Sequence, residues 1–161
     1  MTRQELFQKM PVVRNDLRKI LILTHTDLDG AGAYAVIRSI FPKARADVLF
    51  CGNNRMSNDI ISVLRRKQRY DMIFATDISI SEKDSRLADS LIHDNFLLFD
   101  HHASAEYLNK YKWACVYPGR IEDSPRNGLF KSNCDWHTSG TALVYEYLSY
   151  VLPEHAVEHP S

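Results

Sequence analysis

The sequence predicts an α/β fold of three layers, in which a parallel sheet is flanked by helices on both faces. Two observations predict it. Short apolar segments rich in β-branched and aromatic residues alternate along the chain with longer helical patterns. The apolar segments are continuous and do not alternate between polar and apolar residues, which is typical of strands buried on both faces of a parallel sheet.

The expected elements follow one another in a βαβ rhythm. Strands are expected over residues 19–24, 46–51, 71–76, 95–99 and 113–117. Helical patterns cover residues 3–10, 31–41, 57–69, 82–92 and 103–111. A last helix is capped by Thr138-Ser139 and ends before Pro153, since proline cannot continue a helix. Residues 118–133 carry turn formers and mixed charges, which predicts a long surface loop.

The length of 161 residues suits one domain, with residues 1–18 as an N-terminal extension and residues 151–161 as a frayed tail. Twenty Lys and Arg residues balance twenty Asp and Glu residues. The bulk charge therefore gives no argument for nucleic-acid or membrane binding. The basic run over residues 65–69 is interpreted as a solvated helix end in preference to a binding patch, because cations suit helix C-termini.

The cysteines and the N-terminus predict a cytoplasmic location. Cys51, Cys115 and Cys134 have no C-x-x-C spacing, and an odd count without such a framework suggests reduced thiols. The first residues contain no apolar signal region, and no apolar run approaches the length that spans a membrane.

The strongest functional signal is the segment Thr24–Gly32, which follows the apolar run at residues 20–23. His25, Asp27 and Asp29 stand at alternate positions there. Alternate positions on an extended chain point to the same side, so the three side chains are expected to converge. The carboxyl ends of strands in an open α/β sheet are where ligands bind.

Two further strand ends carry residues of the same kinds. Asp77 follows the expected strand 71–76, and Asp100-His101-His102 follows the strand 95–99. Alone, the first motif or Asp77 could serve as a helix cap or a turn, whereas the adjacent histidines after an apolar strand favour a functional role by themselves. Neighbouring parallel strands lie ~5 Å apart, so their ends can share one cleft. The combination at three successive strand ends therefore favours a metal site.

Imidazole and carboxylate ligands without thiolate suit Mn²⁺, with Mg²⁺ as a possible substitute. The number of ligands exceeds the needs of one small cation. A bridging Asp could hold two ions ~3.5–4 Å apart, an arrangement used for phosphoryl transfer. Backbone N–H groups at Ser139, Gly140 and Thr141 could bind a phosphate, or this helix start could be a simple cap beside His137. His93, His155 and His159 are read as surface residues.

Three segments of this chain resemble the first three motifs of the DHH phosphoesterase superfamily. They are His25-Thr26-Asp27-Leu28-Asp29-Gly30, Asp77 and Asp100-His101-His102. The resemblance covers about residues 19–150 and implies a Rossmann-like DHH domain. That family includes single-strand DNA exonucleases, nano-RNases, cyclic-dinucleotide phosphodiesterases and manganese pyrophosphatases. The compact first motif and the helix over residues 139–148 most resemble the oligoribonuclease branch.

The resemblance implies a role for each motif residue. His25 and Asp27 would bind one metal ion, Asp29 and His101 the other, and Asp77 would bridge them. His102 would lie beside the substrate phosphate. Asp100 would orient a neighbouring metal ligand without binding a metal ion itself. The implied reaction is the divalent-metal-dependent hydrolysis of phosphodiester bonds, through an activated water, in short single-stranded nucleic acid or small nucleotides. Asp77 and His102 would be the catalytic residues.

The sequence departs from the family pattern in two respects. In the family, a fourth metal-binding Asp follows the helix matching 138–150, and a C-terminal substrate-binding domain comes after it. Both features are absent from this sequence. Asp123 and Asp135 are the nearest spare carboxylates, and neither occupies the expected place. Another chain could supply the missing carboxylate, as in a homo-oligomer, or this chain could be a fragment of a longer protein.

Two other functions stay open from the sequence. A pyrophosphatase-like enzyme that hydrolyses phosphoanhydrides would need basic side chains, which Arg120, Arg126 and Lys131 could supply. A non-catalytic module that binds metal or nucleotide would keep the ligands without turnover. Aromatic residues that could stack on bases, or equally pack in the core, are Tyr107, Tyr111, Trp113 and Trp136.

Overall fold

The structure is a computed structural model that describes residues 1–66, 69–119 and 138–155. Its sheet has five strands, all parallel, in the order β2-β1-β3-β4-β5. The strands are β1 (Lys19–His25), β2 (Arg45–Cys51), β3 (Met72–Thr76), β4 (Phe96–Asp100) and β5 (Ala114–Val116). The predicted parallel α/β fold is confirmed.

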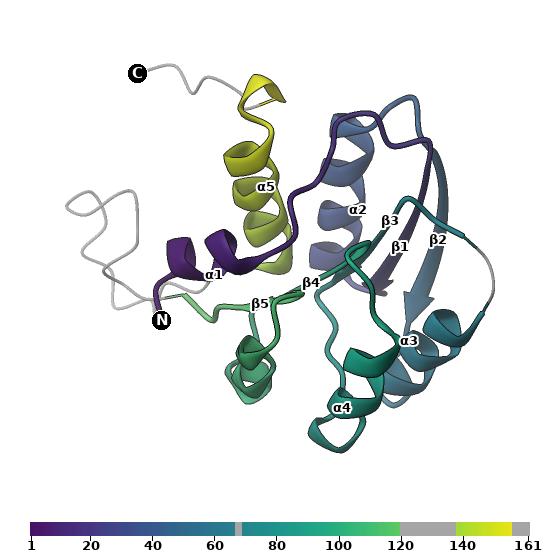
Figure 1. The fold of residues 1–161 in the computed structure, drawn as a ribbon, viewed down its shortest axis with the longest axis vertical. Helices are drawn as coiled ribbons and strands as arrows, with labels where there is room; N and C mark the ends of the chain where they lie inside the picture. The colour runs from purple at the N-terminus through teal and green to yellow at the C-terminus, as the bar shows by residue number, and fades with distance from the viewer. Residues whose placement is uncertain (67–68, 120–137, 156–161) are drawn as a thin grey trace.

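Helices cover both faces of the sheet (Figure 1). The helices α1 (Arg3–Lys9), α2 (Leu28–Ile40) and α5 (Gly140–Val151) pack on one face. The other face is covered by α3 (Met56–Arg65), α4 (Glu82–Leu91) and the 3₁₀ segment η1 (Ala103–Lys110). A short 3₁₀ segment, η3 (Pro153–His155), follows α5.

Alternate residues of the strands build the two hydrophobic cores. Ile20 and Ile22 of β1 belong to the core under α2 and α5, whereas Leu21 and Leu23 belong to the core under α3. Every residue of β3 and β4 is buried. Strands with apolar side chains on both faces bury all of these side chains only when helices cover both faces of the sheet. The continuous apolar runs in the sequence therefore explain the three-layer arrangement.

The order of the strands places a topological switch point at the carboxyl ends of β1 and β3. The chain leaves β1 for β2 on one side and returns to β3 on the other, so strand order reverses between β1 and β3. Open α/β sheets bind ligands at such a switch point. Thr24 and Thr76 are register partners there, and the buried Thr76 hydroxyl donates to Thr24 Oγ1 at 2.9 Å.

The predicted element bounds agree with the structure to within a few residues. The earlier start of α2 matters for the site, because it places Asp29 inside the helix. This helix begins at Leu28, three residues before the predicted start at residue 31. Helix α3 ends at Arg65, before the predicted end at residue 69. Most of the predicted loop over 118–133, the end of the predicted tail and part of the basic run over 65–69 lie outside the described residues.

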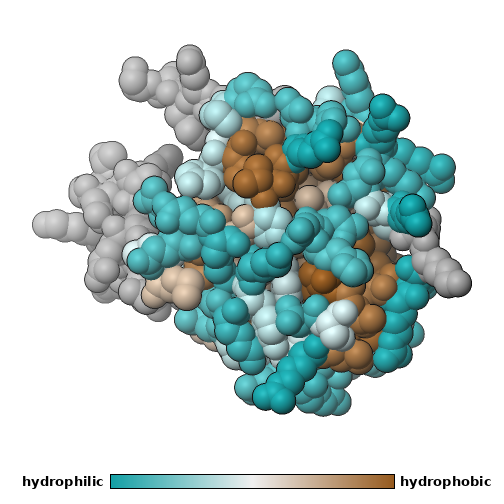
Figure 2. Space-filling view, viewed as in Figure 1, coloured by the Kyte–Doolittle hydropathy of each residue, from teal (hydrophilic) through white to brown (hydrophobic). Residues whose placement is uncertain are grey.

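The face of the molecule shown in Figure 2 is largely hydrophilic, with separate hydrophobic areas. Val48 and Phe50 of the edge strand β2 are among the exposed large hydrophobic side chains. No helix in the described part of the chain is long and apolar enough to cross a membrane. Cys51 and Cys115 are free and buried, and burial raises the pKa of their thiols to about 11 and about 12. The third cysteine, Cys134, lies outside the described residues.

Candidate metal centre

The first part of the site stands at the end of β1. His25 is the last residue of this strand, and its Nδ1 lies 2.8 Å from Oδ2 of Asp27. Asp27 is the N-cap of α2 and accepts a hydrogen bond from the backbone N–H of Gly30 at 2.9 Å. This N–H, together with His25, holds the pKa of Asp27 at about 2. The contact with Asp27 raises the pKa of His25 in turn.

Asp29 reaches the site from the first turn of α2. The expectation that His25, Asp27 and Asp29 alternate along extended chain is wrong for Asp29, because Asp27 already caps the helix. The Asp29 carboxylate accepts hydrogen bonds from the backbone N–H groups of Gly140 at 2.7 Å and Thr141 at 2.9 Å. Burial would raise the pKa of Asp29, but these hydrogen bonds outweigh it, and the pKa lies below its usual value.

Asp77 occupies the centre of the site, directly after β3. Its side chain is 2% exposed, and its Oδ1 lies 3.2 Å from Nε2 of His101. The same His101 nitrogen lies 3.6 Å from Oδ2 of Asp29. Burial raises the pKa of Asp77, and the Asp29 and Asp27 carboxylates add to this effect, whereas His101 opposes it. The second oxygen, Oδ2, is buried and has no hydrogen-bond partner among the described residues.

The backbone of Asp77 is also unusual. Its φ of 56° lies in the left-handed region, which few residues other than glycine adopt. Strain of this kind is found at sites where the surrounding structure over-determines the conformation. Gly140 contributes here, because a Cβ added to it would lie 2.9 Å from Cβ of Asp77. The start of α5 therefore packs directly against this carboxylate.

Asp100 holds the histidine pair after β4. Its Oδ1 accepts hydrogen bonds from the backbone N–H groups of His101 and His102, at 2.8 and 3.3 Å. The same oxygen lies 2.7 Å from Nδ1 of His102. Asp100 is fully buried, whereas the His102 side chain is 57% exposed. The buried carboxylate thus fixes the turn and directs an imidazole that reaches the surface.

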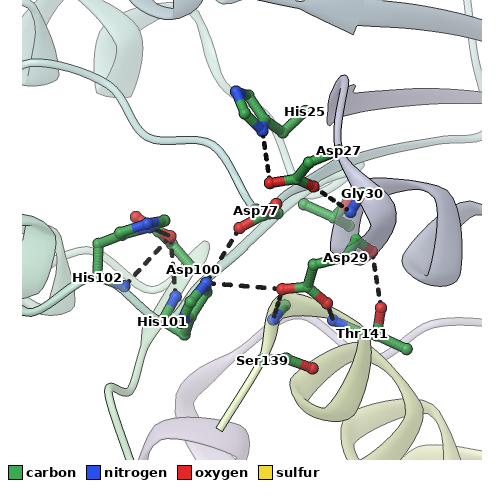
Figure 3. A network of polar contacts seen from close by, with 12 residues as sticks. His25, Asp27, Asp29, Gly30, Asp77, Asp100, His101, His102, Ser139 and Thr141 are labelled. Atoms are coloured by element: carbon green, nitrogen blue, oxygen red, sulfur yellow. Dashed lines mark hydrogen bonds and ion pairs between the residues drawn. The ribbon is translucent and has the colours of Figure 1, made fainter. Parts of the chain in front are cut away.

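Two groups of potential metal ligands share Asp77. One group is His25, Asp27 and Asp77, and the other is Asp77, His101 and His102. The ligand atoms within each group lie within 4.8 Å of one another. Figure 3 shows these side chains converging from the ends of β1, β3 and β4, with Asp29 reaching in from α2. Nitrogen and oxygen ligands without sulfur fit a divalent cation such as Mn²⁺ or Mg²⁺.

The predicted phosphate-binding groups at the start of α5 are otherwise engaged. The N–H groups of Gly140 and Thr141 donate to Asp29, and the Ser139 hydroxyl accepts from the N–H of Ala142 at 3.1 Å. Binding of substrate phosphate by Ser139, Gly140 and Thr141 stays a prediction. Other residues weighed from the sequence lie outside the described residues, namely Arg120, Asp123, Arg126, Lys131, Asp135, Trp136, His137 and His159.

The aromatic residues near η1 that the structure describes pack within the protein. Trp113 is 1% exposed and lies against Phe96 with ring centroids 5.7 Å apart. Tyr111 stacks on Trp113 at 4.9 Å, and the Tyr107 hydroxyl donates to the backbone carbonyl of Ile80. For Trp113, core packing is therefore the correct interpretation.

Sequence reasoning missed Asn53, whose side-chain oxygen contacts Nε2 of His25. Asn53 follows the carboxyl end of β2, which is the edge of the sheet that carries all the other site residues. Its position two residues after an expected strand was the available signal. A neutral amide at this place offers no charge, and the interpretation of the sequence rested on charged or imidazole side chains.

Comparisons with known proteins identify the family. Residues 19–160 match the DHH family, N-terminal domain, and the chain belongs to this family. No curated protein matches the sequence.

The fold is similar to that of two solved structures. One is an uncharacterized protein from Helicobacter pylori G27, with a TM-score of 0.55, 19% sequence identity and 89% of this chain covered. The other is exonuclease RecJ bound to manganese, with a TM-score of 0.50, 12% identity and 98% of this chain covered. In both comparisons this chain spans 39% of the other chain.

Proposed function

We propose that this protein is a divalent-metal-dependent phosphoesterase that hydrolyses phosphodiester bonds in short single-stranded nucleic acid or small nucleotides. The observation that carries the proposal is the position of Asp77, which belongs to both ligand groups and has a buried oxygen without a partner among the described residues. A buried carboxylate beside two others is unfavourable unless a cation or proton compensates its charge. Membership of the DHH family supports the same function.

Two divalent ions would share this site, with Mn²⁺ preferred and Mg²⁺ possible. His25 and Asp27 would hold one ion, Asp29 and His101 the other, and Asp77 would contact both. Bound ions of this kind lower the pKa of water and neutralise charge on a phosphoryl group. The N–H groups of Gly140 and Thr141 orient the Asp29 carboxylate, so the helix α5 fixes one ligand before any ion binds.

The chain itself contributes a positioned imidazole. Asp100 accepts a hydrogen bond from Nδ1 of His102, which fixes the orientation of the ring. Because the His102 ring reaches the surface beside His101, at 4.3 Å between ring centroids, it can face a phosphate held at the centre. An imidazole N–H at this place would donate a hydrogen bond to a phosphate oxygen and orient the scissile bond.

Hydrolysis by the purified chain tests the proposal. Bis(p-nitrophenyl) phosphate and a five-nucleotide single-stranded DNA would be assayed with Mn²⁺, for the wild type and for Asp77→Ala. Asp94→Asn is the matched control, because Asp94 is an exposed carboxylate at the amino ends of the strands. We expect Asp77→Ala to lose at least about 100-fold in rate, since it removes a ligand shared by both ion positions.

Isothermal titration with Mn²⁺ accompanies the assay. Hydrolysis by the wild type and by Asp94→Asn, with loss in Asp77→Ala, supports the phosphoesterase. Retained turnover in Asp77→Ala would contradict a shared ligand. A wild-type protein that binds Mn²⁺ and cleaves neither substrate would contradict the proposed enzymatic activity. It would support the alternative of a module that binds metal or nucleotide without turnover.

A further inference from the structure

A polar cavity of about 320 Å³ lies beside the metal centre. It is lined by residues that follow the carboxyl ends of β2 and β3 and by the first turns of α3 and α4. Asn53 and Arg55 come from the first connection, and Ser79 from the second. Lys83 lies in the first turn of α4. The cavity therefore opens at the same edge of the sheet as the candidate metal centre.

One residue joins the cavity to the centre. Asn53 lines the cavity, and its side-chain oxygen contacts Nε2 of His25. The other ring nitrogen of His25 faces Asp27. Ser79 stands two residues after Asp77 on the opposite wall. A molecule bound at the centre could therefore extend into the cavity past Asn53.

The lining of the cavity favours an anion. Arg55 and Lys83 supply two cations, and Asn53, Asn54 and Asn58 supply amide donors. The acidic residue of the lining, Asp84, already accepts a hydrogen bond from the Ser81 hydroxyl at 2.5 Å. Met56 is the one apolar side chain that this lining includes, so the cavity has little surface on which a base could stack.

The backbone around the cavity adds to this preference. Helices α3 and α4 both begin here, and neither N-cap side chain makes a capping hydrogen bond. Helix N-termini carry partial positive charge, which adds to that of the side-chain cations, while Asp59 and Glu82 in the first turns offset part of it. The hydroxyl of Ser57 in α3 accepts from the N–H of Ser81 before α4 at 2.6 Å, which ties the two helix starts together.

We infer that this cavity binds the phosphate of the nucleotide next to the scissile bond. The inference rests on the proposed function and adds a substrate class to it, namely chains with at least two phosphates. Such a substrate would place one phosphate at the metal centre and the next between Arg55 and Lys83. A simple diester such as bis(p-nitrophenyl) phosphate has no second phosphate and would leave the cavity empty.

Binding without turnover tests the inference directly. The probe is a fluorescein-labelled five-nucleotide single-stranded DNA, measured by fluorescence anisotropy in EDTA at several salt concentrations. We expect Arg55→Ala and Lys83→Ala each to weaken binding several-fold. Each should also reduce the slope of log Kd against log salt by about 0.7, as for the loss of one phosphate contact on a single strand.

Lys112→Ala is the matched control. Lys112 is an exposed cation that pairs with Asp94 at 2.6 Å, at the amino ends of the strands and away from the cavity. This variant should bind the probe like the wild type. Equal affinity and equal salt slope for the wild type, Arg55→Ala and Lys83→Ala would overturn the inference. Equal losses in all three variants, Lys112→Ala included, would also overturn it, because binding would then follow total charge.

Steady-state cleavage provides a second readout. Arg55→Ala and Lys83→Ala should raise KM for the oligonucleotide by a larger factor than KM for bis(p-nitrophenyl) phosphate. An equal effect on both substrates would contradict a second-phosphate site. The two proposals fail separately, because the anisotropy measurement needs no hydrolysis and the Asp77→Ala assay does not depend on this cavity.

Discussion

Thr141 contacts Asp29 at two places, although 112 residues separate them. The Thr141 N–H donates to Oδ1 of Asp29 at 2.9 Å, and its hydroxyl donates to the backbone carbonyl of Asp29 at 2.7 Å. The first bond orients a carboxylate that lies beside His101, and the second fixes the first turn of α2. The start of α5 thus positions a metal-binding candidate on a different helix.

Thr141→Val tests this coupling. Valine keeps the shape of the side chain and removes the hydroxyl that donates to the Asp29 carbonyl. We expect a loss of about 1 kcal/mol in the free energy of unfolding, typical of one hydrogen bond, and a several-fold weaker affinity for Mn²⁺. Urea unfolding and isothermal titration measure the two effects. Thr141→Ser keeps the hydroxyl and should retain the affinity, and weakening in both variants would contradict the role of this bond.

Gly140→Ala tests the packing of α5 against Asp77. The added Cβ would lie 2.9 Å from Cβ of Asp77, so the helix or the carboxylate must move. We expect Mn²⁺ affinity to fall at least about 10-fold, because coordination fails when a ligand is displaced by a fraction of an ångström. Gly52→Ala is the control, since its Cβ would meet no atom within 4 Å. Equal affinity in the two variants would show that Gly140 is not needed for the site.

Asp77→Asn separates the stability of the fold from metal binding. The amide removes a buried charge that lies near the carboxylates of Asp27 and Asp29. In EDTA we expect the variant to be at least as stable as the wild type, because an uncompensated buried charge is unfavourable. Added Mn²⁺ should raise the Tm of the wild type, by mass action, and leave that of the variant unchanged. Thermal unfolding with and without Mn²⁺ measures both, and an equal rise in Tm would contradict the assignment of Asp77.

The fold could be predicted because its determinants are local in the sequence. Each strand buried on both faces contains a continuous apolar run, as in residues 72–75 and 96–99, and a polar residue of the site follows within two residues. Alternation of strand and helix then places these ends at one edge of the sheet. The approach of Asp77 Oδ1 to His101 Nε2, at 3.2 Å, agrees with that topology.

The rest of the site depends on contacts between distant parts of the chain. No local pattern indicates that Gly140 and Thr141 donate to Asp29, because the crossing of α2 and α5 is set by packing. The left-handed backbone of Asp77 is likewise imposed by its surroundings, since aspartate does not favour it strongly by itself. Sequence reasoning therefore named side chains that the structure brings together and missed the contacts that hold them in place.

Asp71 provides a prediction about pH that is independent of the metal centre. Its Oδ2 accepts hydrogen bonds from the backbone N–H groups of Lys19 at 2.9 Å and Arg18 at 2.7 Å, which joins the start of β1 to the residue before β3. These bonds hold the pKa of Asp71 below its usual value. The unfolded chain therefore binds the Asp71 proton more readily than the folded chain. The resulting stabilisation is present above about pH 4 and is lost as pH falls through the folded pKa.

Asp71→Asn should reveal this pH dependence. At pH 7 we expect the variant to be about 1 kcal/mol less stable than the wild type, because a neutral amide accepts the two N–H groups less strongly than a carboxylate. Between about pH 4 and pH 2 the difference should shrink, since the wild-type carboxyl becomes neutral as well. Urea unfolding of both proteins across this range measures the difference. A difference that stays constant from pH 7 to pH 2 would show that the charge of Asp71 does not stabilise the junction of β1 and β3.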